Sequence, residues 1–277
     1  MSNNSRLTEK PQTGFEVPDD MRPPEGMWTG VWRRFRRHPG AVAGSIVFII
    51  LVLSIVLVSF SPYDPEASDL PDMRLPPSMR HPFGTDPLGR DMLTRVLYGG
   101  RISLAVGLMV VAITLVIGVP IGALAGYFGG WLDNILMRIT DAVLSFPPLL
   151  VLIILSAMLR EMDIPFIQRN NVVTIALVIG VLGWMTVARL VRAAFLSLRE
   201  KEFVLAAHSM GTSTFRIMVR HILPNAMGPV IVESTMMIAW AIMEESGLSF
   251  LGFGIMPPTP SWGNLLSNAQ EHLSLIH

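Results

Sequence analysis

Cysteine is absent from this 277-residue chain, which excludes disulfides, thiolate metal ligands and cysteine nucleophiles. Charged residues are scarce, at 15%, and lysine occurs only at Lys10 and Lys201. The formal net charge is zero, so nothing favours a nucleic-acid partner. Soluble domains carry a charged shell, so this scarcity, together with 51% hydrophobic residues and a mean hydropathy of +0.51, predicts an integral membrane protein.

Motifs for hydrolysis are missing too. A phosphate-binding loop needs a glycine followed by a lysine, and neither lysine follows a glycine, so this chain is not itself an ATPase. The 6 histidines form no HExxH motif, and the nearest approach to G-x-S-x-G, at Gly247, ends in Leu251. We therefore expect no enzyme activity, no metal site and no cofactor in this chain.

Five apolar segments are long enough to cross a membrane, because a hydrocarbon core of about 30 Å takes about 20 helical residues. The first of them has no charged residue and starts too late to be a cleaved secretory signal. We predict an all-α integral membrane protein, with spans at residues 41–60, 103–126, 142–159, 172–196 and 228–250.

The distribution of basic residues predicts the orientation. The cluster RRFRR at residues 33–37 precedes the first span, and residues 199–220 hold four more basic residues. Basic residues gather in cytoplasmic loops, so both segments are predicted to lie inside. Residues 1–40 then form a cytoplasmic tail, whereas residues 61–102 and 252–277 lie on the extracytoplasmic side.

The loop of residues 61–102 is predicted to end in a helix on the membrane surface. Asp86 suits the N-cap, Pro87 the first helical position and Gly99 the stop. One apolar face would contain Leu88, Met92, Leu93, Val96 and Leu97. Two interpretations are open, since the helix could only anchor the loop or could take part in gating.

Glycines recur every four residues in the second predicted span, at Gly118, Gly122 and Gly126. They share one helical face, on which another backbone can approach closely. We favour packing within this chain over a partner-subunit interface or a lining of the transport path. Pro120 is predicted to kink the same helix.

The fifth predicted span contains acidic residues, each of which costs roughly 2.5–3.5 kcal/mol near the centre of a bilayer. We favour pairing within a helix interface or contact with the outer surface. The hypothesis of a polar substrate path remains open, and its candidate residues are Glu233, Met237, Trp240, Glu244 and Glu245.

The stretch EFVLAAHSMGTSTFRIMVRHILPN, residues 202–225, lies between the last two predicted spans. Helical spacing of apolar residues predicts two short helices, broken at Gly211 and ended by Pro224, with Thr212 or Ser213 as the cap of the second. The apolar residues at helical spacing are Phe203, Ala207 and Met210 in the first helix. In the second helix the apolar face consists of Phe215, Met218, Val219 and Ile222. From the residues alone, a covering loop and a knob for a cytosolic partner are equally favoured.

Four segments together resemble the permease subunits of ABC importers, more closely their dipeptide, oligopeptide and nickel branch. They are AAHSMG with HILPN nine residues later, WRRFRRHPGAVAG, HPFGTDPLGRDMLTRVLYGGRISLAVG and LSFLGFGIMPPTPSWGNLL. The first resembles the cytoplasmic EAA loop of that family. The first position of its triplet is Leu205 here, and the nearest acid is Glu202.

The resemblance implies the type I ABC importer transmembrane-domain fold. Residues 103–277 would form the permease core domain, and residues 199–225 a coupling loop that docks into an ATPase subunit. The contact would involve Glu202, Ala206, Ala207, Gly211, Thr212, Phe215, Arg216 and His221, with Leu223 and Pro224 setting the turn back into the membrane.

The resemblance also implies partners. They are a second homologous permease subunit, two ATPase subunits that hold ATP and Mg²⁺, an extracytoplasmic substrate-binding protein and membrane lipid. The location would be the cytoplasmic membrane of a bacterium or archaeon, and the solute a peptide or a related compound such as a nickel chelate. A gradient-driven carrier or channel is the alternative, as is a scaffold that recruits a cytosolic partner.

Members of that family continue past the SWGN segment into a sixth span, whereas this chain stops at His277. We expect a truncated or incomplete chain, and not a natural five-span variant.

Overall fold

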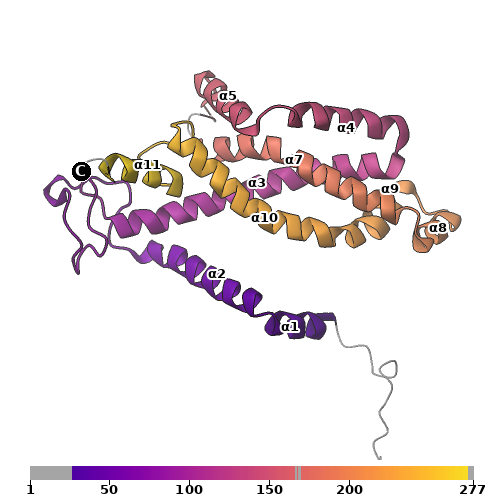
Figure 1. Cartoon of the computed structure of the whole chain (residues 1–277), viewed down its shortest axis with the longest axis horizontal. Coiled ribbons are helices and arrows are strands. Elements are labelled where there is room, and N and C mark those ends of the chain that lie inside the picture. Colours follow the sequence, from indigo (N-terminus) through magenta and orange to yellow (C-terminus); the bar gives the residue numbers. More distant parts are fainter. Residues whose placement is uncertain (1–26, 166, 168–169, 274–277) are drawn as a thin grey trace, which may run out of the picture. The chain divides into compact units, whose positions relative to one another are not determined.

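The computed structural model describes residues 27–165, 167 and 170–273 (Figure 1). This described part is mostly helical and has no strand, only an isolated bridge between Thr85 and Asp91. Among the described residues, four helices are long and apolar enough to cross a membrane, or five if a bent pair counts as one span. The predicted all-α membrane class is therefore confirmed.

The chain divides into two units, residues 1–53 and residues 54–277, which are described separately. The first contains α1 (Met27–Arg37) and most of α2 (Pro39–Leu57). The two helices are separate because the residue before a proline avoids the helical conformation, and His38 instead caps α2 by accepting a hydrogen bond from the Ala41 N–H at Nδ1, 3.2 Å away. A short 3₁₀ turn, η2 (Val58–Phe60), extends α2, so the first predicted span is confirmed.

The second unit is built around three long helices, α3 (Met92–Phe128), α7 (Asn171–Leu198) and α10 (Leu223–Phe250). The most extensive packing is between α3 and α7. It depends on the glycine stripe of α3, because a Cβ at Gly122 would lie 2.4 Å from the carbonyl oxygen of Ala188 on α7. Gly118 and Gly126 face α7 just as closely. The stripe thus packs within this chain, and α3 continues through Pro120.

The third predicted span, residues 142–159, is wrong as a single helix. The structure has α4 (Gly130–Leu144) and α5 (Pro148–Glu161), bent by 85° from each other. The cause lies in the sequence Phe146-Pro147-Pro148, because two consecutive prolines remove two backbone donors and hold the preceding residue out of the helical region. The prediction treated residues 142–159 as one apolar helix and overlooked the break at the two prolines.

The predicted surface helix between Asp86 and Gly99 is also wrong. Asp86 closes a turn instead, and its carboxylate accepts hydrogen bonds from the Leu88 and Arg90 N–H groups. The helix that follows is α3 itself, capped by Asp91, whose side chain accepts from the Thr94 N–H at 2.8 Å. Gly99 lies inside α3, where its missing side chain admits the backbone of Ser261.

The segment after α10 folds back as α11 (Trp262–Leu273), which packs against α3 and α10. The Trp262 indole N–H donates to the Val96 carbonyl at 3.0 Å, and the Trp262 backbone N–H donates to Ser103 Oγ at 3.2 Å. Within the second unit, α11 and residues 61–91 lie at one end of the long helices, and α8 (Glu202–Ser209) lies at the other (Figure 1).

Candidate functional site

The insert between α7 and α10 consists of α8, α9 (Thr214–Arg216) and a π-helical segment, η4 (Ile217–Ile222). Its break is at Gly211, as predicted, with φ of +77°. The Gly211 N–H donates to the His208 carbonyl at 2.9 Å, and the Thr212 N–H donates to the Ala207 carbonyl at 3.1 Å. This pair of bonds is the Schellman motif, which favours glycine at the left-handed position. The N-cap of α9 is Ser213.

Pro224 does not end the second helix, so that prediction is wrong. The backbone passes from α9 through η4 into α10 as one helix of 37 residues. Proline lacks an N–H and its ring displaces the carbonyl four residues back, a conflict that a widened π turn accommodates. In η4 the Leu223 N–H donates five residues back, to the Met218 carbonyl, and Asn225 Nδ2 donates to the His221 carbonyl at 2.7 Å.

The inward side of the insert is part of the core. Five of its residues are buried in one apolar cluster with side chains of α3, α7 and α10, namely Val204, Ala207, Ile217, Met218 and Ile222. Protein interiors are close-packed and transmit strain, so a displacement of the insert displaces the long helices with it. The insert is therefore a rigid projection of the helix bundle.

Its outward side presents an apolar tip, by which we mean Leu205, Met210 and Phe215. These side chains are 58%, 79% and 76% exposed. Helical spacing had grouped Met210 with Ala207, and Phe215 with Met218, but the structure exposes the first of each pair and buries the second. Spacing fails here because α8 is short and η4 has a wider turn than an α-helix.

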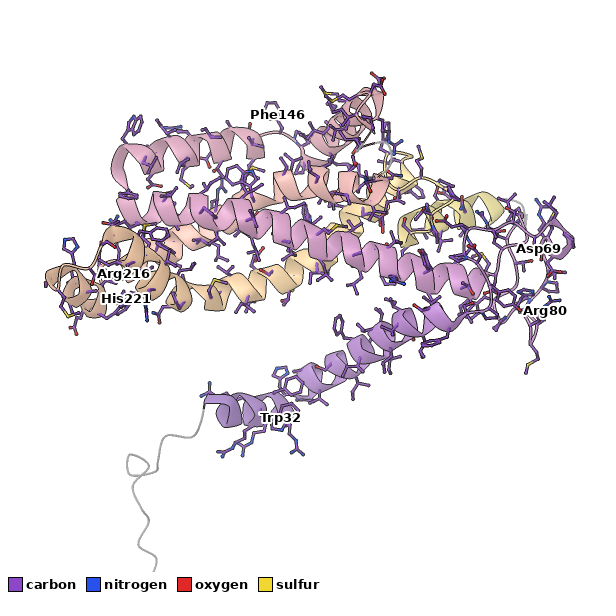
Figure 2. The ribbon with its side chains drawn as sticks, turned by 180° about the vertical axis from the view of Figure 1, so that it is seen from behind. Trp32, Asp69, Arg80, Phe146, Arg216 and His221 are labelled. Atoms are coloured by element: carbon purple, nitrogen blue, oxygen red, sulfur yellow. The ribbon has the colours of Figure 1, made fainter. Side chains whose placement is uncertain are left out.

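The residues predicted to contact an ATPase divide by exposure. Ala207 is buried, and Thr212, His221 and Leu223 are half-buried. The exposed ones are Glu202, Ala206, Gly211, Phe215, Arg216 and Pro224. Arg216 and His221 lie at the same end of the molecule (Figure 2). Leu205 and Met210 were not among the predicted contacts. The sequence did contain a signal for them, since both are large apolar residues in a short segment between the basic residues Lys201 and Arg216.

Two ion pairs join α7 to α4 near this end. Arg192 forms a two-pronged pair with Asp133, with Nη2 donating to Oδ2 at 2.6 Å, and Arg189 pairs with Asp141. Both arginines lie in the C-terminal half of α7. Their partners lie 59 and 48 residues away in the chain, which no local pattern could reveal.

A cavity of about 380 Å³ opens where the bend between α4 and α5 meets α7 and α10. Three of the predicted path residues line it, Glu233, Met237 and Trp240 on α10. The bend contributes Phe146, whose side chain projects at the break between the two helices (Figure 2). Most of the lining is apolar, as in small-molecule pockets generally.

The other two predicted path residues lie elsewhere. Glu245 is fully buried, and its carboxylate accepts hydrogen bonds from Ser249 Oγ at 2.7 Å and Ser103 Oγ at 3.2 Å. The same serine hydroxyls accept backbone N–H bonds from Ile255 and Trp262, so Glu245 joins α10, α3 and the segment that leads to α11. Glu244 is half-buried and does not line the cavity.

The end of the molecule that carries residues 61–91 is held by a polar network. His81 is buried, with Nδ1 3.0 Å from Asp91 and Nε2 3.5 Å from Asp72. Arg95, also buried, donates to the Pro65 carbonyl at 2.6 Å. Asp69 and Arg80 lie on this part of the loop (Figure 2). Within the described residues no group of three or more acidic or histidine side chains could hold a metal ion.

These features define a class of protein, a helical membrane protein with an exposed insert that packs into the core of its long helices. The chain belongs to the family of inner membrane components of binding-protein-dependent transport systems, whose model matches residues 118–276. Residues 26–77 match the N-terminal transmembrane domain of oligopeptide transport permease C. It is thus a multi-pass inner membrane protein and a transporter subunit.

Several relatives are similar over most of the chain. The dipeptide transport system permease protein DppC of Bacillus subtilis is 41% identical over 90% of this chain and 75% of its own length. The oligopeptide permease OppC of the same organism is 37% identical over 90% and 79%. The glutathione transport system permease GsiD of Escherichia coli is 39% identical over 92% and 81%. A solved chain of the MetNI methionine ABC transporter has a TM-score of 0.49 at 18% identity, covering 64% of this chain and 87% of that one.

Proposed function

We propose that this chain is a permease subunit of an ATP-driven importer that carries peptides into the cytoplasm. In this proposal residues 199–225 form the coupling loop, and the apolar tip docks on an ATPase subunit that holds ATP and Mg²⁺. The chain has no catalytic residues of its own and adopts the type I importer arrangement of spans. A second homologous permease subunit and surrounding lipid complete the membrane assembly.

One observation carries this proposal. The insert is exposed and apolar on one side, at Leu205, Met210 and Phe215, while its other side is continuous with the core of α3, α7 and α10. Large exposed apolar side chains on a short basic segment are typical of a protein interface. A partner bound there would move the spans directly, because no flexible linker separates the tip from them.

The orientation follows from this assignment. The insert and the N-terminal basic cluster face the cytoplasm, so the N-terminus is cytoplasmic and residues 61–91 face outside. The polar network around His81 and Asp91 fixes that outer loop. A rigid outer loop is suited to receive an extracytoplasmic binding protein, which would deliver the peptide.

The test uses the absence of native cysteine, so that Met210→Cys introduces the only thiol in the chain. In native membranes with all subunits present, we expect this thiol to cross-link to an ATPase subunit, with a yield that changes when ATP is added. Met79→Cys is the matched control, because Met79 is a fully exposed methionine at the opposite end of the same unit. It is expected to give no ATPase adduct.

A reactive Met210→Cys thiol that forms no adduct with an ATPase, in membranes that contain one, would contradict the coupling assignment. Uptake measured in the same vesicles separates the remaining alternative. An ATP-driven importer keeps its uptake when ionophores collapse the ion gradients, whereas a gradient-driven carrier loses it.

A further inference from the structure

The cavity beside the bend between α4 and α5 contains a single ionisable group among its described lining residues. That group is the carboxylate of Glu233, and the side chains around it include Met236, Met237 and Trp240 of the same helix. The cavity volume, about 380 Å³, lies within the range of about 300–1,000 Å³ that small-molecule sites occupy. An apolar pocket with one charge is built for a ligand with one opposite charge.

Glu233 has no partner inside the described part of the chain. It forms no hydrogen bond and no ion pair there, whereas the buried Glu245 on the same helix receives two serine hydroxyls. A carboxylate within an apolar span is costly, and a cation in contact with it offsets that cost. The two acids of α10 therefore differ. Glu245 has its hydrogen bonds within the fold, whereas the Glu233 carboxylate can bind a ligand.

The helix places aromatic and apolar surface in line with this carboxylate. Met237 lies one turn beyond Glu233, and Trp240 lies two turns beyond, about 10 Å along the helix axis. An indole ring attracts a cation through its face and packs against an apolar side chain with equal ease. The site thus matches a ligand with an ammonium group at one end and an apolar body.

We propose that this cavity binds a short peptide during its passage, with Glu233 pairing with the N-terminal ammonium group and Trp240 and Met237 contacting an apolar side chain. The inference rests on the proposed function, since it names the part of the peptide that the permease itself contacts. In this inference, the permease itself selects peptides whose N-terminal amine is free.

The experiment measures protection of a thiol that is the only one in this chain, with the transporter assembled in membranes. Met236→Cys places it on the rim of the cavity, where Met236 is 67% exposed, and Met243→Cys is the matched control on the same helix, 74% exposed and outside the cavity. The probes are the dipeptide leucyl-phenylalanine and its N-acetyl derivative, which lacks the ammonium group. The readout is the rate of labelling by N-ethylmaleimide.

We expect leucyl-phenylalanine to slow labelling of Met236→Cys severalfold and to leave Met243→Cys unaffected. The N-acetyl derivative should protect only at concentrations about tenfold higher or more, because it lacks the charged hydrogen bond. Adding Glu233→Gln to Met236→Cys should abolish this preference, and Glu233→Asp should restore part of it.

Equal protection by both probes, or a preference that survives Glu233→Gln, would overturn the inference. So would a Met236→Cys thiol that never reacts, since it would mean a cavity closed to solutes. Loss of the second permease subunit from Glu233→Gln preparations would likewise overturn it, by identifying a partner side chain as the cation. ATP-driven uptake by the unmodified transporter, measured in parallel, reports on the proposed function independently.

Discussion

The side-chain amide of Asn225 donates a hydrogen bond of 2.7 Å to the carbonyl oxygen of His221, where the π-helical turn η4 meets α10. This bond ties the first turn of α10 to the last turn of η4, next to Pro224, which has no N–H to donate. It helps to keep the insert and the last span in one continuous helix. The Asn225 side chain therefore contributes to the rigidity of the insert.

Asn225→Ala is expected to destabilise this junction by about 1 kcal/mol, the net value of one hydrogen bond. In a transporter, a softer junction should lower uptake while ATP hydrolysis continues, so the number of peptides carried per ATP falls. Parallel measurements of uptake and ATPase rate in proteoliposomes test this. Asn225→Gln is a weaker control, because it keeps the amide but displaces it by one methylene. An unchanged number of peptides carried per ATP in Asn225→Ala would contradict the expectation.

Gly211→Ala is expected to loosen the tip of the insert. The glycine has φ of +77° with no atom within 4 Å of an added Cβ, so the cost comes from the backbone alone, about 1–2 kcal/mol. Gly228→Ala is the matched control, because Gly228 lies in α10 with equally open surroundings and ordinary helical φ. Binding of the ATPase subunits should weaken in the first variant only, which co-purification at graded salt can measure.

Gly122→Ala is expected to push α3 away from α7. The added Cβ would lie 2.4 Å from the Ala188 carbonyl oxygen and 2.8 Å from the Val191 Cβ, neither of which can move without its helix. Overpacking of this kind costs typically about 1–3 kcal/mol. Thermal unfolding of the purified complex should show a lower midpoint. Gly44→Ala in α2, with nothing within 4 Å, should leave the midpoint unchanged.

Glu245→Leu is expected to prevent stable folding at the end of the bundle near α11. The change leaves the buried Ser103 and Ser249 hydroxyls without their carboxylate partner, at a cost of roughly 1–3 kcal/mol. Glu245→Gln retains an amide that can bond both hydroxyls, so we expect it to express and transport nearly normally. Transport lost in Glu245→Gln, with the protein folded, would instead place this residue in the substrate path.

The membrane spans show how much of the helical structure apolar content alone can predict. Residues 41–60 contain no charged residue and residues 172–196 contain only Arg189 and Arg192, and both spans were predicted to within a few residues. Residues 142–159 are just as apolar, yet the structure bends there by 85°. Hydropathy reports which residues prefer lipid, whereas the direction of the backbone at Pro147 and Pro148 depends on dihedral angles that hydropathy does not contain.

The candidate site divides in the same way. Gly211 marked the turn of the insert in the sequence because its requirement is local, a left-handed residue after a helix. The roles of Glu233 and Glu245 were not separable from the sequence, since both are acids in one apolar segment. Only the position of Ser103 on α3, 142 residues away in the chain, distinguishes the buried structural acid from the acid that faces a cavity.

The amino-acid sequence was enough to predict a membrane protein, to favour packing through Gly118, Gly122 and Gly126, and to show that the insert resembles a coupling loop. These properties follow from composition and from short-range spacing. The three-dimensional structure was needed to learn which side chains of the insert are exposed, which arginines pair with Asp133 and Asp141, and which acid lines the cavity. Those outcomes depend on contacts between distant segments, and contacts of that kind form only when the whole chain packs.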